Sequence, residues 1–228
     1  LRKDKRFSIK LIITSEKSSA FKLKKNQKKF KGIELLKTNN MHEIYNLITE
    51  KKIYKLVSTA YSRIFPSFFF EKKRLKMINV HPSFLPQRRG ADPVRNGILN
   101  DDKYFGITAH LINKEIDCGP IIARFRLIND KKKNTWEVLH NLGLEYFKEI
   151  IENIFLYFNC EKQTFSTPKL KIDKPVTDEM LAIKESDDLV TAKKKILAAL
   201  PFRFVHVKLN NKIIKIKSSF ELKKKNGL

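Results

Sequence analysis

Apolar runs of strand length alternate with helix-length periodic segments along the first 160 residues of this 228-residue chain. The runs predicted as strands are Ile9–Thr14, Lys55–Ala60, Lys76–Val80, Phe105–Ile112 and Pro120–Leu127. The segments predicted as helices are Met41–Lys52, Phe65–Phe70, Pro93–Leu99 and Asn134–Asn159. Because strands and helices alternate, we predict an α/β fold with a doubly wound, mainly parallel sheet.

The termini of the two longer helices carry their own signals. Asn39 or Asn40 is expected to cap the first of them. Asn134-Thr-Trp-Glu137 has the spacing of a capping box, which predicts where the last helix begins. Pro66 fits the first turn of the short helix between them, because a proline at that position loses no hydrogen bond.

The composition changes after residue 160. Thr164–Pro175 is polar, contains two prolines and lacks periodicity, so residues 161–180 are predicted to be a linker. Beyond it, a helix is predicted at Asp188–Leu200. Two alternating strands follow at Phe204–Leu209 and Lys212–Lys217, joined by an Asn210-Asn211 turn. We therefore expect a main domain at 1–160 and a small α+β module at 181–228.

The chain carries a formal net charge of +24, and 42% of its residues are hydrophobic. No apolar run approaches the length that crosses a bilayer, and the charged start lacks a signal-peptide core, so we expect a cytoplasmic protein without a membrane partner. The two cysteines indicate neither a disulfide framework nor a metal cluster. Residues 1–33 hold 12 basic and 2 acidic residues, which would attract RNA or belong to a lysine-rich surface.

The most specific chemistry lies around residues 79–90. Asn79 and His81 are two apart, so on a strand they share one face, and Pro82 is expected to end that strand. Asp117 lies 38 residues after Asn79, before a Gly-Pro turn. We expect an amide, an imidazole and a carboxylate to converge at one sheet edge, where open α/β folds bind their ligands.

Each of these residues alone has a structural reading. Asn79 could end a strand, His81 could be a core histidine and Asp117 could form a turn. Arg88, Arg89 and Arg95 flank the same loop and could contact an anionic ligand or form a solvated rim. No pair of histidines has metal-ligand spacing, so we predict no metal.

Longer strings containing these residues resemble the folate-dependent formyltransferase family, whose members include the methionyl-tRNA, amino-sugar and glycinamide ribonucleotide formyltransferases. The resemblance spans about Ile9 to Phe158. It rests on five strings: Ala60-Tyr-Ser-Arg-Ile-Phe65, Asn79-Val-His-Pro-Ser-Phe-Leu-Pro86, Arg89-Gly-Ala-Asp-Pro93, Gly106-Ile-Thr-Ala-His110 and Ile116-Asp-Cys-Gly119. The family's first strand has no counterpart before Leu1, so we expect a sheet without that strand.

The resemblance implies roles for matching positions. It places catalytic residues at Asn79, His81 and Asp117. It implies that the co-substrate 10-formyltetrahydrofolate contacts two segments, Ser62-Arg63-Ile64-Phe65 and Glu115-Ile116. We add Arg88, Arg89 and His110 as candidate contacts to the substrate.

The predicted function is transfer of a formyl group from 10-formyltetrahydrofolate to a primary amine. The Arg-Gly-Ala-x-Pro string, the linker and the basic charge favour initiator methionyl-tRNA as acceptor and partner, with no DNA partner. The alternatives are an amino-sugar nucleotide, then glycinamide ribonucleotide. Two further readings are a non-catalytic RNA-binding protein on this scaffold and a hydrolase that releases formate.

Overall fold

The computed structural model describes residues 8–15, 32–61, 63–157, 162–163, 171–209 and 212–216. The chain divides into two compact units, residues 1–78 and 79–228, and their boundary falls within strand β4 (Lys76–His81). The predicted boundaries at 160 and 180 do not coincide with this division and stay predictions. The predicted Asn210-Asn211 turn and the basic segment 22–31 lie outside the described residues.

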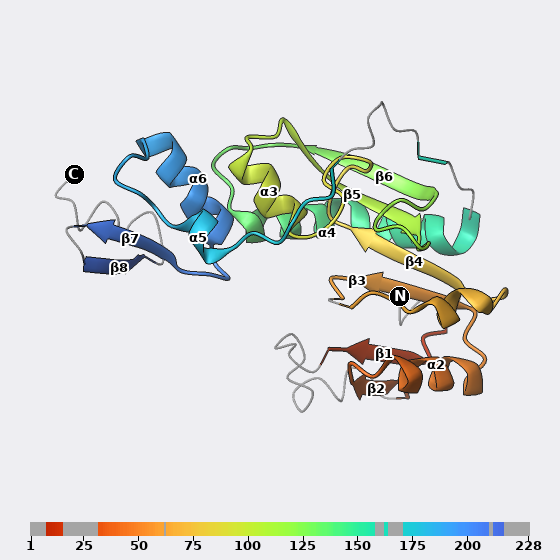
Figure 1. The fold of residues 1–228 in the computed structure, drawn as a ribbon. Helices are drawn as coiled ribbons and strands as arrows, with labels where there is room; N and C mark the ends of the chain where they lie inside the picture. Colours follow the sequence, from red (N-terminus) through yellow and green to blue (C-terminus); the bar gives the residue numbers. More distant parts are fainter. Residues whose placement is uncertain are drawn as a thin grey trace. The chain divides into compact units, whose positions relative to one another are not determined.

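The first unit begins with two short parallel strands (Figure 1). Its elements are β1 (Leu11–Thr14), β2 (Glu34–Lys37), α2 (Met41–Glu50), β3 (Lys55–Thr59) and the 3₁₀ turn η2 (Ser67–Glu71). Asn40 caps α2 by accepting from the amides of His42 and Glu43. Ile44 and Ile48, one helical turn apart, are each only 1% exposed. Strand β2 was not predicted, because two leucines between charged residues are too short a pattern to stand out.

The second unit contains the end of β4 and all later elements. They are α3 (Pro93–Leu99), β5 (Tyr104–Leu111), β6 (Ile121–Ile128), α4 (Thr135–Glu152), the π-helical turn η3 (Asn153–Tyr157), α5 (Asp178–Leu181), α6 (Leu189–Ala199), β7 (Val205–Leu209) and β8 (Lys212–Ile216). The predicted capping box at Asn134 opens α4, which ends earlier than predicted because the chain turns π-helical at Asn153. Helix α5 was not predicted.

The main sheet has the strand order β3-β4-β5-β6. Strand β5 is buried over six consecutive residues, as expected for an interior strand, whereas β6 alternates between covered and exposed residues. Strands β5 and β6 are antiparallel, so the sheet is mixed rather than uniformly parallel. Their register shifts between Ala109 and His110, where such an irregularity can re-aim a side chain.

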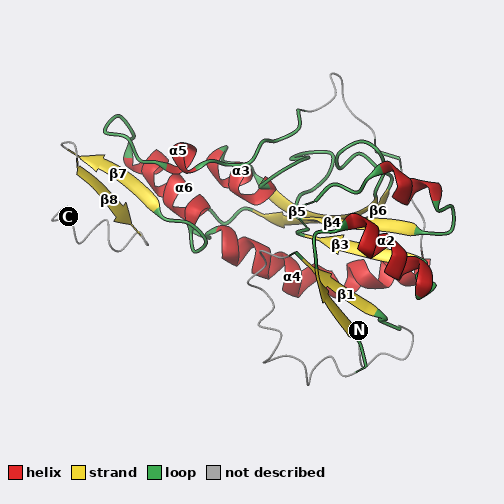
Figure 2. Cartoon of the chain, turned by 60° about the horizontal axis from the view of Figure 1, so that its bottom comes forward, coloured by secondary structure: helices red, strands yellow, loops and turns green. Residues whose placement is uncertain are grey.

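The C-terminal elements pack on the second unit's own helices. Helix α6 contacts α3 and α4, and Figure 2 shows α5 and α6 beside α3. The carbonyl of Ala198 accepts hydrogen bonds from Arg95 Nε at 3.1 Å and from Thr135 Oγ1 at 2.9 Å. These bonds connect α6 to α3 and α4, the helices that carry Arg95 and Thr135.

Candidate active site

The end of strand β4 presents two of the predicted residues to one carboxylate. Asn79 Nδ2 donates to Asp117 Oδ1 at 3.2 Å, and His81 Nδ1 lies 3.6 Å from Asp117 Oδ2. Since side chains two residues apart share a strand face, the backbone itself aims both groups at the same point. The structure therefore brings Asn79, His81 and Asp117 together within the second unit.

His110 joins this cluster from strand β5. Its Nε2 lies 3.4 Å from Asp117 Oδ1 and 3.4 Å from Asn79 Nδ2. The side chain is buried, with 2% exposure, at the register shift of the β5–β6 pair. His110, which was predicted only as a substrate contact, thus lies directly against the carboxylate.

Backbone carbonyls fix the hydrogen on each imidazole. His81 Nε2 lies 2.8 Å from Arg88 O, and His110 Nδ1 lies 2.8 Å from Leu111 O. Because a carbonyl oxygen only accepts, each of these nitrogens carries a hydrogen. The remaining nitrogen of each ring faces Asp117, and a proton added to the His81 ring would be stabilised by that carboxylate.

The charge states follow from the surroundings. Burial lowers the pKa of His81, against the opposing effects of Asp117 and of the hydrogen bond to Arg88 O. Burial would raise the pKa of Asp117, but the His110 hydrogen bond, the field of His81 and the Gly90 amide lower it to about 2. At neutral pH the site therefore combines an ionised carboxylate with an uncharged His81, which can accept a proton.

The loop at residues 88–90 supports these groups through its backbone. Arg88 O holds His81, and the Gly90 amide donates to Asp117 Oδ2 at 2.9 Å. Arg89 is 2% exposed, and its Nε and Nη2 both donate to Ile116 O, at 2.9 and 2.6 Å. This buried arginine holds the segment that carries Asp117. Its predicted contact to substrate stays a prediction.

Two residues near Asp117 were missed from the sequence. Gln163 Nε2 donates to the carbonyls of Asp117 and Gly119, at 3.1 and 2.7 Å. Asp117 itself has a left-handed backbone with φ of 48°. At Gly119, a β-carbon would lie 1.8 Å from Leu111 O, so only glycine fits. The Gly-Pro pair at residues 119 and 120 is the sequence signal that could have indicated Gly119. Nothing in the sequence indicates Gln163.

The predicted folate contacts in the first unit remain predictions. Ser62 lies outside the described residues, Arg63 is exposed, and Ile64 is 77% exposed. Phe65 packs against Phe69, with ring centroids 5.1 Å apart. In the second unit, Glu115 and Ile116 are both exposed residues of the segment that leads to Asp117.

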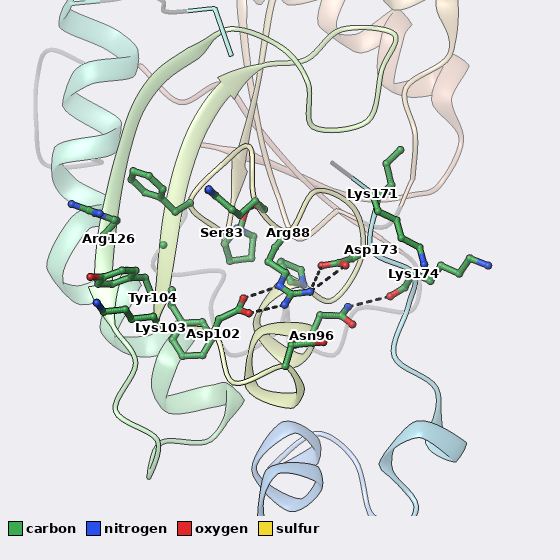
Figure 3. A pocket seen from close by; sticks show the side chains of 18 of the residues that line it. Ser83, Arg88, Asn96, Asp102, Lys103, Tyr104, Arg126, Lys171, Asp173 and Lys174 are labelled. Atoms are coloured by element: carbon green, nitrogen blue, oxygen red, sulfur yellow. Dashed lines mark hydrogen bonds and ion pairs between the residues drawn. The ribbon is translucent and has the colours of Figure 1, made fainter. Parts of the chain in front are cut away.

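A separate pocket of about 920 Å³ lies beside the loop (Figure 3). Arg88 reaches into it and is paired with Asp102 and Asp173. The other cations that line it are Lys103, Arg126, Lys171 and Lys174. The Arg126 guanidinium lies near two rings, 5.3 Å from Phe84 and 5.2 Å from Tyr104. The pocket therefore combines positive charge with aromatic surface.

Within the described ranges, no group of three or more His, Cys, Asp or Glu side chains could hold a metal ion. Among the helices of that same part of the chain, none has the length and apolar character needed to span a membrane.

The family model described as "Formyl transferase" matches residues 3–149, well over half of the chain. The protein therefore belongs to the formyl transferase family, and the predicted family is confirmed. The chain folds into a mixed sheet with parallel strands and flanking helices. Solved formyltransferase structures have the same fold. The α/β fold class is confirmed as well.

Curated relatives are methionyl-tRNA formyltransferases. The chain is 26% identical to that of Finegoldia magna over 228 residues, covering 91% of this chain and 70% of the relative. It is 32% identical to that of Pelagibacter ubique over 147 residues, covering 62% of this chain and 47% of the relative. The chain thus spans between about half and 70% of the length of these relatives.

Solved structures agree in fold. Methionyl-tRNA formyltransferase from Clostridium thermocellum superposes with a TM-score of 0.68 at 19% identity, covering 92% of this chain and 97% of that one. HypX from Aquifex aeolicus, solved in complex with tetrahydrofolic acid, superposes with a TM-score of 0.69 at 16% identity. It covers 90% of this chain and 36% of that one.

Proposed function

We propose that this protein transfers a formyl group from 10-formyltetrahydrofolate to the amino group of methionyl-tRNA. The observation that carries the proposal is the meeting of Asn79, His81 and His110 around the ionised carboxylate of Asp117. Family membership supports the reaction class, and the names of the curated relatives support the acceptor.

Formyl transfer to an amine needs three things from the protein. A donor must stabilise the negative charge that develops on the formyl oxygen, the amine must lose a proton, and the folate nitrogen must gain one. Asn79 cannot titrate near neutral pH, so its amide is assigned to the oxygen. Its amide nitrogen lies 3.2 Å from Asp117 Oδ1 and 3.4 Å from His110 Nε2, so a substrate oxygen would have to displace one of these two partners to receive an amide hydrogen.

His81 is assigned to the proton. Its Nδ1 carries the lone pair, because Nε2 donates to Arg88 O. A proton taken from the attacking amine would then be held between Nδ1 and Asp117 Oδ2, which are 3.6 Å apart. Asp117 acts as the counter-charge, because a neighbouring carboxylate favours the protonated ring. His110 Nε2 lies 3.4 Å from Asp117 Oδ1, the oxygen that accepts from Asn79, whereas His81 faces Oδ2.

The 920 Å³ pocket supports a polyanionic acceptor. Between the described residues, no ion pair links Lys103, Arg126, Lys171 or Lys174 to a carboxylate. Cations of this kind bind phosphates through contacts that weaken as salt rises. The Phe84 and Tyr104 rings, which lie 5.3 and 5.2 Å from the Arg126 guanidinium, add aromatic surface of the kind on which nucleic-acid bases stack.

The deciding experiment is an acceptor panel with 10-formyltetrahydrofolate as donor. Methionyl-tRNA, glycinamide ribonucleotide and a 4-amino-sugar nucleotide are supplied in turn, and one reaction contains no acceptor. We expect formylation of methionyl-tRNA alone. Formylation of the sugar nucleotide or of glycinamide ribonucleotide would refute the acceptor. Formate release without acceptor would indicate a hydrolase, and RNA binding without turnover a binding protein.

Variants test the residue roles. Asn79→Ala is expected to lower kcat by about 10²–10³, the usual effect of losing one donor to a developing oxyanion. Asp117→Asn should also reduce turnover strongly. Asp130→Asn is the matched control, because that carboxylate lies in an exposed turn outside the site. Wild-type turnover by Asn79→Ala would refute the assigned roles.

A further inference from the structure

Arg88 is connected to the catalytic cluster by its backbone and not by its side chain. Its carbonyl accepts from His81 Nε2 at 2.8 Å, which fixes both the orientation and the tautomer of that ring. Arg88 has a left-handed backbone with φ of 55°, a conformation that a non-glycine residue adopts only at a cost. Some other interaction must therefore hold this residue in place.

Two carboxylates hold the Arg88 side chain. Nε and Nη2 donate to the two oxygens of Asp102, at 2.7 and 2.6 Å, and Nη1 lies 3.4 Å from both oxygens of Asp173. Figure 3 shows the guanidinium between these two acids. A paired, two-point contact of this kind fixes an arginine far better than a single charge could.

The two carboxylates come from distant parts of the sequence. Asp102 lies between α3 and β5, whereas Asp173 belongs to residues 171–176, which precede α5. The backbone of Asp173 also bonds to the loop that follows Arg88. Its amide donates to Arg89 O at 2.7 Å, and its carbonyl accepts from the Ala91 amide at 3.0 Å. A β-carbon on Gly90 would lie 2.4 Å from Asp173 O, so glycine is required for this close approach.

The side chain of Arg88 is poorly suited to bind an anionic ligand. Its donors are directed at two carboxylates, and an incoming phosphate or carboxylate would meet their negative charge. Lys103, Lys171 and Lys174, which line the same pocket, have no carboxylate partner among the described residues and are the better ligands for an anion.

We propose that Arg88 is a positioning residue for His81, held by a clamp formed by Asp102 and Asp173. Asp173 thereby supports the catalytic cluster from the segment that precedes α5. The expected effect of the clamp on turnover rests on the proposed function. The expected effect of the clamp on the His81 ring does not depend on any acceptor.

The clamp hypothesis and a substrate-binding hypothesis predict opposite results for the same variants. If Arg88 bound an anionic substrate, Asp102→Asn or Asp173→Asn would release its guanidinium and lower KM for that substrate. If Arg88 positions His81, the same variants should lower kcat, because misplacing a catalytic group by about 1 Å can reduce the rate 10²-fold. KM should then change by no more than about twofold, since ground-state binding is untouched.

The second readout is the His81 ring itself. The charged or titratable groups that face it are Asp117, His110 and Asp173, and the Arg88 carbonyl fixes its other nitrogen. Asp173→Asn removes a negative charge that favours the protonated ring, so the pKa of His81 should fall. Asp102→Asn should shift the Nε2 signal by loosening the carbonyl that this nitrogen donates to.

The experiment measures ¹⁵N-histidine NMR spectra between pH 4 and 8, together with steady-state kinetics, for both variants in the full chain. His81→Gln assigns the signal. The matched control is Asp178→Asn, because Asp178 also lies 3.4 Å from an arginine nitrogen, that of Arg203, without reaching the loop at 88–90. Urea unfolding of each variant verifies that it is folded.

Shifted His81 signals with reduced kcat in both clamp variants, and neither effect in the control, are the expected result. Unchanged His81 signals in both variants, or a lower KM for the acceptor, would overturn the clamp. Shifted signals in a protein that formylates no acceptor would refute the proposed function and leave the clamp intact. Formylation of methionyl-tRNA together with unchanged His81 signals in both variants would refute the clamp and leave the proposed function intact.

Discussion

Replacing Asp117 by asparagine tests the electrostatics of the site without depending on the substrate. The Asp117 side chain is 12% exposed and lies against two imidazoles and the Gly90 amide. These contacts lower its pKa from 3.8 to about 2. A carboxyl group with a lowered pKa stabilises the folded state above its unfolded pKa, and that stability is lost as pH falls through the folded value.

The magnitude follows from the two pKa values. The difference between 3.8 and about 2 corresponds to roughly 2 kcal/mol of folding free energy at pH 6. At pH 3 the unfolded carboxyl is largely protonated and the folded one largely ionised, so about 1 kcal/mol remains. Asp117→Asn cannot titrate, so its penalty relative to wild type should shrink by about 1 kcal/mol from pH 6 to pH 3.

The assay is urea unfolding followed by circular dichroism at both pH values, with the free energy extrapolated to water. The penalty of Asp117→Asn at pH 3 is subtracted from its penalty at pH 6. This subtraction cancels the free energy of the hydrogen bonds that asparagine fails to make at both pH values. Asp130→Asn, outside the site, provides the control. A penalty for Asp117→Asn that is equal at pH 6 and pH 3 would refute the account of the carboxylate given above.

Three further predictions concern single positions. Gly119→Ala should destabilise the fold and displace Asp117, because its β-carbon would lie 1.8 Å from Leu111 O; unfolding and turnover both report it. The lowered pKa of His81 means that stability falls as pH drops below about 6.5, and His81→Gln should lack this fall in a pH series of thermal unfolding. Asn134→Ala removes the α4 cap and should cost about 1 kcal/mol of unfolding free energy, with unchanged kcat.

Local patterns accounted for much of the fold. The caps at Asn40 and Asn134 and the helix at Pro93–Leu99 were predictable, because capping and short-range periodicity depend on neighbours in the sequence. The same-face relation of Asn79 and His81 also follows from a two-residue strand repeat. By contrast, β2 and α5 are each four residues long, too short for a period to emerge.

The contacts around Arg88 and Arg89 were not predictable. Both arginines appeared as candidate ligands for an anion, yet one is clamped by two carboxylates and the other is buried on Ile116 O. Asp173 and Gln163 lie in a region that was predicted as a linker, yet both donate or accept hydrogen bonds beside the site. Partners of Gln163 and Asp173 that lie 44 to 85 residues away leave no periodic trace in the sequence.

The sequence by itself determined the family, the α/β class and the identity of the amide, imidazole and carboxylate, since these depend on residue types and short spacings. Only the tertiary structure decided which nitrogen of each histidine faces Asp117 and how far the pKa of that carboxylate falls. It also decided that Asp173 pairs with Arg88, the residue whose carbonyl holds the His81 ring. The physical reason is that desolvation, tautomer choice and ion-pair geometry depend on groups that folding brings within about 4 Å, whatever their separation along the chain.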